Sequence, residues 1–370
     1  MSPVHPRIEE PPFRFFGSER SYFSGKARAA FRAKRLHFEE ILPDRDVNRE
    51  IRRRTGGLFF LPTVVTPEGD TWQDTSDIID ALEARRPEPA LLPATALQRV
   101  VAYLFEIYAD EFMILPAMHH RWGTPEGERD ARDSFAAASG DPAASDKFAD
   151  TMSGALPMLG VSEITRDAIV GHLDDLLPRM ESVFVDQGFL LGERVSLADR
   201  AMLGPFYGHF YLDLVPGPML RRRSPRISNW IERMNHPNVA PFAGFREGDG
   251  LHPSLRGVLE LIGRDAGPVI LDTVRDFERW ADQQPAGEHT PPRGIGGHET
   301  HLRGVAFQRY TSSYTLWMLQ RPLDAYAALS GTERAAVDAA LAGTGCEELL
   351  AYRPRHRLYK RDFRIVCNRL

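Results

Sequence analysis

Short strands and helices alternate in the N-terminal part of this chain in an order that few folds accommodate. Residues 63–65 (TVV) and 71–73 (TWQ) are short β runs on either side of Pro67-Glu68-Gly69-Asp70, which is rich in turn formers. They predict an antiparallel hairpin. Further upstream, strand-like runs at 13–16 (FRFF) and 37–42 (HFEEIL) lie on either side of a helical segment. Because a helix between two strands returns the chain to its starting edge, these two strands are expected to pair in parallel.

Two helices frame this region. The first is predicted over 24–36 (SGKARAAFRAKRL), where Ser24 can cap the first turn through its side-chain oxygen. The last is predicted over 75–86, where an apolar stripe ends before Pro87. The complete order is β-α-β-α-β-β-α, and a mixed sheet of this kind is typical of the thioredoxin-like fold. We therefore expect a thioredoxin-like domain over residues 11–90.

The middle of the chain has an almost wholly helical pattern. Residues 94–115 run without a helix breaker, and residues 163–187 form a second long candidate helix. Ser196-Leu197-Ala198-Asp199 is a capping box, in which the serine side chain accepts from the third backbone N–H and the aspartate reaches back. We expect an all-helical domain over 94–245.

A long extension follows a linker over 236–252. Helical stripes recur in it, one of them over 302–320. Residues 285–300 are rich in proline and glycine and predict a loop, whereas residues 357–366 alternate imperfectly and predict a strand. We expect a mostly helical extension over 250–370 that packs on the helical domain rather than a tethered independent domain.

One stripe of the extension is aromatic. Its members recur at helical spacing and are Phe307, Tyr310, Tyr314, Trp317 and Met318. Such a stripe is typical of a helix face in a packed core, which is the preferred interpretation. A lid over an active site is the alternative.

Composition excludes several classes of protein. Two cysteines, Cys346 and Cys367, are too few for a disulfide scaffold and argue against a zinc site built on cysteines, and they fit a reducing compartment. A net charge of −5 provides no basic field for nucleic acid. The N-terminus lacks the pattern of a secretory signal, and no stretch approaches the roughly 20 apolar residues that span a bilayer. We expect a cytoplasmic protein with no membrane or nucleic-acid partner.

Two short motifs in the extension resemble ligand sites but do not meet their requirements. His298-Glu299-Thr300-His301 has residue types that bind metals, but the segment is rich in glycine and suggests no third ligand. Gly294-Ile295-Gly296-Gly297 is not a phosphate loop, because no Gly-Lys-Ser/Thr follows it. We expect no bound metal.

Four motifs occur in the order and at the spacing of one protein family. The first is Ser21-Tyr22-Phe23-Ser24-Gly25-Lys26-Ala27-Arg28, which falls without gaps on a loop S-P-Y-S-x-K-V-R, with Tyr22 in place of the proline. The others are Leu61-Pro62, Gln73-Asp74-Thr75-Ser76-Asp77-Ile78-Ile79 and Gly192-Glu193-Arg194-Val195-Ser196-Leu197-Ala198-Asp199. They match an X-Pro strand start, an E-S-x-A-I-I segment and a G-x-x-x-S-x-A-D capping motif. The chain therefore resembles the glutathione transferases, in particular bacterial-type members with a serine in this loop.

The resemblance implies an α+β protein with glutathione as co-substrate. It also implies a small hydrophobic electrophile as second substrate, for conjugation, isomerisation, dehalogenation or peroxide reduction, and a homodimer. The alternative is a binding or scaffold protein that has kept the fold, because fold alone does not imply activity and ordinary members of the family lack the extension. A thiol–disulfide oxidoreductase is disfavoured, because residues 1–345 contain no cysteine.

A site that uses glutathione must ionise its thiol. A free thiol has a pKa near 8.5, so only about 3% is thiolate at pH 7, and a pKa lower by two units requires roughly 2.7 kcal/mol of anion stabilisation. A hydroxyl donor at a helix N-terminus supplies energies of this size. We expect Ser24 to cap the 24–36 helix. Ser21, which aligns with the catalytic Ser or Cys of the family, is then left to donate to the thiolate.

Alternatives remain open for these hydroxyl groups. Ser24 can be a plain N-cap without a part in the chemistry, although it is kept as a second catalytic candidate. Ser21 can be a loop serine in an inactive relative. Tyr22 is a third candidate donor.

The resemblance also assigns the residues that bind glutathione. The backbone of Leu61 would pair with the cysteinyl part of the ligand, and Pro62, cis in the family, would set the geometry. Thr75 and the free N–H groups of its helix would hold the γ-glutamyl carboxylate, while Asp74 would face the γ-glutamyl ammonium. The alternatives are an ordinary trans proline and an N-cap pair without a ligand. Asp77 replaces the usual alanine, and nothing in the sequence explains it.

Several polar and aromatic side chains of the helical domain are candidates to line a pocket for the electrophile. They are Tyr103, Glu106, Tyr108 and His119-His120-Arg121-Trp122. Packing in the core or on the surface is the preferred interpretation.

Overall fold

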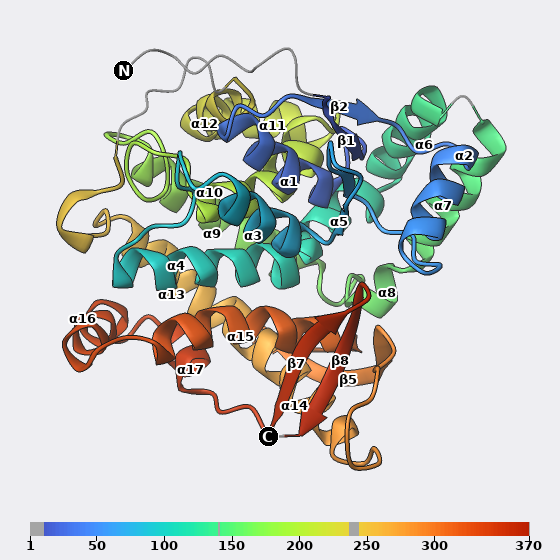
Figure 1. The fold of residues 1–370 in the computed structure, drawn as a ribbon. Coiled ribbons are helices and arrows are strands. Elements are labelled where there is room, and N and C mark those ends of the chain that lie inside the picture. The colour runs from blue at the N-terminus through green and yellow to red at the C-terminus, as the bar shows by residue number, and fades with distance from the viewer. Residues whose placement is uncertain (1–10, 140, 237–243, 370) are drawn as a thin grey trace.

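The computed structural model describes residues 11–139, 141–236 and 244–369. Its first part contains β1 (Phe13–Phe16), α1 (Tyr22–Ala33), β2 (Phe38–Ile41), α2 (Arg45–Arg54), β3 (Thr63–Val65), β4 (Thr71–Gln73) and α3 (Thr75–Arg85). The strands form one mixed sheet in the order β2-β1-β3-β4 (Figure 1). β1 is parallel to β2 and antiparallel to β3, and β3 is antiparallel to β4. The predicted element order, parallel pair and thioredoxin-like arrangement are confirmed.

Alternation along β1 explains the layers around this sheet. Phe13 and Phe15 point to one face, where their rings contact Phe31 of α1 edge-on at centroid distances of 5.3 and 5.6 Å. Phe16 points to the other face and packs with Ile51 of α2. Because successive strand residues face opposite sides, the four residues FRFF bury both faces of the strand.

The helical domain follows the sheet, as predicted. Its elements are α4 (Ala96–Ile107), η1 (Tyr108–Phe112), α5 (Ile114–Trp122), α6 (Pro125–Ser139), α7 (Pro142–Gly154), α8 (Leu156–Leu159), α9 (Arg166–Val183), α10 (Leu197–Pro205), η2 (Phe206–Tyr211), α11 (Pro216–Arg223) and α12 (Pro225–Asn235). The capping box is present: the Ser196 hydroxyl accepts from the backbone N–H of Asp199 at 3.4 Å, and the Asp199 carboxylate accepts from the N–H of Ser196 at 2.9 Å. That buried carboxylate also accepts from the Trp230 indole at 3.0 Å, so it joins α10 to α12.

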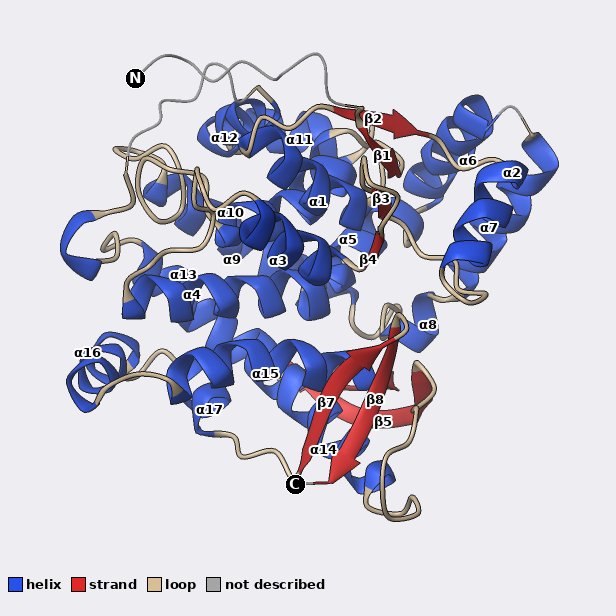
Figure 2. Ribbon diagram, in the orientation of Figure 1, coloured by secondary structure: helices blue, strands red, loops and turns tan. Residues whose placement is uncertain are grey.

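The extension combines helices with two hairpins. Its elements are η3 (Glu247–Asp249), α13 (Leu255–Leu261), η4 (Ile262–Ala266), α14 (Gly267–Ala281), β5 (Gly294–Leu302), β6 (Val305–Ser312), α15 (Ser313–Ala327), α16 (Gly331–Leu341), α17 (Cys346–Ala351), β7 (His356–Arg361) and β8 (Arg364–Arg369). Figure 2 shows the β5–β6 and β7–β8 hairpins apart from the main sheet. The mostly helical character is confirmed, whereas the single strand predicted over 357–366 is wrong in part, because this range contains most of β7, a two-residue turn and the start of β8.

Two predictions for the extension are wrong in part. Residues 285–300, predicted as a loop, contain the start of β5, because antiparallel pairing with β6 outweighs the low strand propensity of its glycines. Residues 302–320, predicted as a helix, contain the whole of β6 before α15 begins. The helical spacing from Tyr310 to Tyr314 is therefore a coincidence across a strand–helix boundary.

The extension packs on the helical domain, as expected. α15 lies along α4 on the side away from α10 (Figure 1). One contiguous core includes Phe31 of α1, Leu104 of α4, Leu316 of α15 and Leu358 of β7. The division into 11–90, 94–245 and 250–370 stays a prediction. In the part of the chain that the structure describes, no helix has the length and apolar character to cross a membrane.

Candidate active site

Three segments of the sheet domain meet at one edge of the sheet. Phe16, the last residue of β1, and Gln73, the last residue of β4, both pair with Thr63 at the start of β3. The loop after β1, the Leu61–Pro62 dipeptide before β3 and the Asp74–Thr75 pair after β4 therefore lie on the same side of the molecule. The Leu61–Pro62 bond is cis, as predicted. The structure thus brings the predicted binding residues to the edge that also carries the two serines.

Ser21, and not Ser24, is the N-cap of α1. The backbone of Ser21 is extended, with φ −79° and ψ 128°, and its side-chain oxygen accepts from the N–H of Ser24 at 3.3 Å. The prediction that Ser24 caps the helix and leaves Ser21 free is wrong. The helix starts earlier because Tyr22 is already helical and anchored, with its buried hydroxyl donating to the carbonyl of Ala109 at 2.5 Å.

The two serines differ in their access to a ligand. Ser24 lies in the first turn with 0% of its surface exposed, and its hydroxyl oxygen accepts from the N–H of Ser18 at 3.3 Å. Ser21 is half-buried. Capping uses only a lone pair of its oxygen, so the hydroxyl proton is left to donate. Ser21 therefore presents the more accessible of the two hydroxyl groups.

The loop before α1 is clamped from the helical domain. Arg121 of α5 donates to the carbonyl of Arg20 at 2.9 Å and to that of Gly208, and it pairs with Asp213 at 2.8 Å. Gly204 of α10 lies so close that a Cβ there would come within 2.9 Å of the Tyr22 carbonyl oxygen. Arg121, one of the candidates for an electrophile pocket, is buried and holds this loop in place instead.

Asp74 and Thr75 begin α3. Asp74 has φ +83°, which is unusual for a residue other than glycine, and its Oδ1 accepts from the N–H of Ser76 at 2.8 Å. Thr75 is buried. The second carboxylate oxygen of Asp74 lies 3.2 Å from Nζ of Lys360, a residue of β7. Both oxygens of Asp74 therefore already have partners.

Lys360 is a residue of this site that the sequence did not reveal. Its ammonium also donates to Oδ2 of Asp77 at 2.8 Å, which gives a structural reason for the aspartate in place of alanine. Burial, together with the neighbouring charge of Asp74, raises the pKa of Asp77 to about 6, against the opposing charge of Lys360. The unexplained Asp77 was the one signal in the sequence, and it did not indicate where its partner lies.

A buried cluster of charges lies next to the first turn of α3, where the Ser76 hydroxyl donates to Glu106 at 3.3 Å. Lys26 of α1 contacts Glu106 at 2.8 Å and Asp110 at 2.5 Å, and Arg321 of α15 contacts Glu106 at 2.7 Å. Burial raises the pKa of Glu106, but the charges of Arg321 and Lys26 outweigh it and lower the pKa to about 2. Burial raises the pKa of Asp110 to about 7, against the charge of Lys26. Glu106 is thus a packed ion-pair residue, as preferred from the sequence.

Tyr108 is also a packed residue. Its hydroxyl and Nε2 of His172 are 2.7 Å apart, and Nδ1 of His172 is 2.8 Å from Asp265 of the extension. Burial raises the pKa of Asp265, but hydrogen bonds from His172 and Arg264 outweigh it and hold the pKa below its usual range. This buried chain of hydrogen bonds joins the extension to the helical domain.

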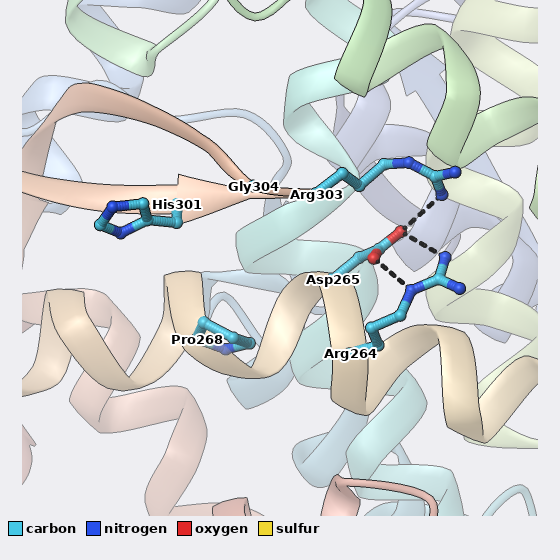
Figure 3. A pocket seen from close by; sticks show the side chains of 6 residues that line it. All are labelled: Arg264, Asp265, Pro268, His301, Arg303 and Gly304. Carbon is cyan, nitrogen blue, oxygen red and sulfur yellow. Dashed lines mark hydrogen bonds and ion pairs between the residues drawn. The ribbon is translucent and has the colours of Figure 1, made fainter.

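Two cavities are lined mainly by the extension. In the first, of about 390 Å³, Arg264 and Arg303 converge on Asp265 (Figure 3), with N···O distances of 2.7 and 3.2 Å. The second, of about 520 Å³, shares Arg264 and Pro268 with the first. Neither is lined by a residue predicted for the site, and both arginines of the first also pair with Asp175, at 3.3 and 2.9 Å.

The metal-like motif of the extension has a structural role. The ring nitrogens of His298 lie 3.1 Å from the hydroxyl of Thr273 and 2.7 Å from that of Thr311. Within residues 11–139, 141–236 and 244–369, no three or more histidine, cysteine, aspartate or glutamate side chains form a group that could hold a metal ion.

Comparison with known protein families gives two matches. Residues 15–90 match the model of the glutathione S-transferase N-terminal domain, and residues 147–238 match that of the glutathione S-transferase C-terminal domain. Neither match reaches the extension. No curated protein matches the chain.

Several solved structures are similar to about two thirds of the chain. A glutathione S-transferase from Rhodospirillum rubrum is 17% identical, with 67% of this chain and 91% of that chain covered and a TM-score of 0.40. One from Methylobacterium radiotolerans, in complex with glutathione sulfonate, is 21% identical, with 64% and 98% covered and a TM-score of 0.39. One from Ceriporiopsis subvermispora, in complex with glutathione, is 17% identical, with 61% and 99% covered and a TM-score of 0.43.

Proposed function

Because the chain belongs to the glutathione S-transferase family, we propose that it binds glutathione along the sheet edge formed by Leu61–Pro62 and Asp74–Thr75. The bound thiol is then activated for attack on a small hydrophobic electrophile. The observation that supports this most is that these two segments and the capped N-terminus of α1 meet at one edge. Isomerisation and peroxide reduction use the same activated thiol and are included in the proposal. The homodimer that the resemblance implies is also part of it, and sedimentation velocity tests that part.

Each segment has a distinct part in the proposed complex. The backbone of Leu61 pairs with the cysteinyl part of the ligand in the manner of an added strand. Thr75 and the first N–H groups of α3 hold the γ-glutamyl carboxylate, because a helix N-terminus favours anions. Asp74 receives the γ-glutamyl ammonium. The ligand then spans the edge with its sulfur toward the loop before α1.

Ser21 stabilises the thiolate in this proposal. Its hydroxyl donates to the sulfur, while the partial positive charge of the α1 N-terminus adds to the effect. Serine is a hydrogen-bond donor and the glutathione sulfur is the nucleophile.

A non-catalytic binding or scaffold role is the second candidate. One observation favours it: the carboxylate of Asp74 already pairs with Lys360, so the subsite for the ligand ammonium is occupied from within the chain. In this case the protein keeps the family fold and shows no turnover.

Glutathione binding and turnover separate these candidates. We expect titration calorimetry to show glutathione binding, and Thr75→Ala to weaken it by about tenfold or more, since a buried donor to a carboxylate is lost. Thr151→Ala, on the exposed face of α7, is the matched control and keeps the wild-type affinity. Binding without turnover across several electrophiles supports the scaffold role, and equal affinities of wild type and Thr75→Ala contradict the proposed site.

A further inference from the structure

The ammonium of Lys360 lies in a complete cage. It donates to Oδ2 of Asp77 at 2.8 Å and to the hydroxyl of Tyr314 at 2.8 Å, and it lies 3.2 Å from Oδ2 of Asp74. The ring of Trp317 faces it at 4.8 Å from the centroid. Two carboxylates, a hydroxyl and an aromatic face are the groups that recognise an ammonium ion.

The cage is built from two distant parts of the chain. Asp74 caps α3 of the family fold and Asp77 lies in its first turn, whereas Tyr314 and Trp317 belong to α15 of the extension. Arg321, also on α15, forms a two-point contact with Asp80 of α3 at 2.7 and 2.9 Å. The two helices that form the cage, α3 and α15, are therefore joined by an ion pair that does not involve Lys360.

The hairpin that carries Lys360 is anchored on both sides of this residue. At its base, the Gln320 side chain of α15 exchanges two hydrogen bonds with the backbone of Leu358, at 2.9 and 2.7 Å. Beyond Lys360, Arg364 donates to the carbonyl of Gly56 at 2.8 Å. The backbone of the hairpin is thus anchored by contacts that do not involve the Lys360 side chain.

We propose that Lys360 determines the ligand specificity of the site by occupying the place that the ammonium of glutathione takes beside Asp74. This inference rests on the proposed function. One oxygen of Asp74 caps α3 and the other faces Lys360, so a ligand ammonium binds only after the Lys360 side chain has left. A thiol ligand that has the γ-glutamyl carboxylate but no ammonium binds without displacing it.

The consequence is a change in selectivity when Lys360 is removed. In the wild type, the Lys360 ammonium competes with the ammonium of glutathione and lowers the affinity for glutathione. A deamino analogue, with a glutaryl group in place of γ-glutamyl, has no ammonium and is not affected by this competition. In Lys360→Met, the two carboxylates are free to bind an ammonium, and they repel an analogue that brings only negative charge. The ratio of the dissociation constant of the analogue to that of glutathione should therefore rise.

Titration calorimetry of both ligands tests this. We expect Lys360→Met to bind glutathione at least about tenfold more tightly than the wild type and to raise the analogue-to-glutathione ratio by at least the same factor. Lys147→Met, at an exposed lysine of α7, is the matched control. The double variant Lys360→Met/Asp77→Ala, which restores the family alanine, provides the same test if two unpaired aspartates prevent the single variant from folding.

The outcomes distinguish this inference from the function on which it rests. If the wild type binds glutathione and the Lys360 variants bind it equally or more weakly, the proposed competition by Lys360 is overturned. The proposed glutathione site is supported in that case. If the variants bind glutathione and the wild type does not, both are supported. If no variant binds either thiol, both are overturned.

Discussion

The backbone N–H of Ser24 donates to the side-chain oxygen of Ser21 across 3.3 Å, so the residue proposed to meet the thiolate also starts the helix. One side chain then has two functions that mutagenesis removes together. Ser21→Ala should lower stability by about 1 kcal/mol through the lost cap. It should also lower turnover by one to two decades, because a donor to an anion contributes roughly 1.5–3 kcal/mol. A thermal melt and a pH–rate profile measure the two effects.

Ser24→Ala is expected to act on stability alone. The buried Ser24 hydroxyl accepts from the N–H of Ser18, and its loss leaves that donor without a partner at a cost of about 1–3 kcal/mol. Ser182→Ala, exposed on α9, is the control for both serines. A Ser24→Ala protein that is stable but inactive would reverse the assignment of the two residues.

Gly204→Ala tests the close contact between α10 and the start of α1. A Cβ at this position would lie 2.9 Å from the Tyr22 carbonyl oxygen, so the helices must move apart. We expect a loss of about 1–3 kcal/mol in the free energy of unfolding, measured by urea denaturation. Gly154→Ala, which meets no atom within 4 Å, should leave stability within about 0.5–1 kcal/mol of wild type. Equal effects of the two substitutions would show that the contact between Gly204 and Tyr22 can accommodate a methyl group.

The buried carboxyl of Asp110 gives the stability a defined pH dependence. Its pKa is near 3.9 in an unfolded chain and is raised to about 7 in the fold by burial. Between these values the native state binds more protons than the unfolded state, so this group makes stability fall as pH rises from about 4 to about 7. Asp110→Asn keeps the shape and cannot ionise. It should therefore lose less stability than wild type over this range.

Urea denaturation at pH 4.5, 6 and 7.5 measures the difference between Asp110→Asn and wild type. The comparison begins at pH 4.5 because Glu106, with its pKa lowered to about 2, acts in the opposite direction mainly at lower pH. The raised pKa of Asp77, about 6, acts in the same direction as Asp110 in both proteins, so the slope should decrease rather than vanish. Asp133→Asn, exposed on α6, is the control, and parallel curves for Asp110→Asn and wild type would contradict the assignment.

The sequence was sufficient where the structural signals are local. The turn between β3 and β4 and the capping box of Ser196 and Asp199 each depend on a few consecutive residues, and both were predicted correctly. The start of α1 was not, because it depends on where Tyr22 packs, and that is decided by Ala109 in another domain. Local pattern cannot report a tertiary contact of this kind.

The strands of the extension and the cage around Lys360 depend on longer-range contacts still. The glycines at the start of β5 form a strand only because β6 pairs with them. Lys360 and Asp77 are 283 residues apart in the sequence. Charge complementarity over such a separation leaves no periodic trace, and one aspartate in an unexpected position was its only sign.

The continuous core has a consequence for the order in which the molecule is made. Ribosomes release the N-terminus first, so the sheet domain and α4 emerge while β7 has still to be synthesised. Leu358 of β7 belongs to the same core as Phe31 of α1, and contacts between such distant parts of a chain form slowly because long loops must close. Part of the core of the nascent protein therefore stays open until β7 has been synthesised. Chaperones have that interval in which to bind the open core.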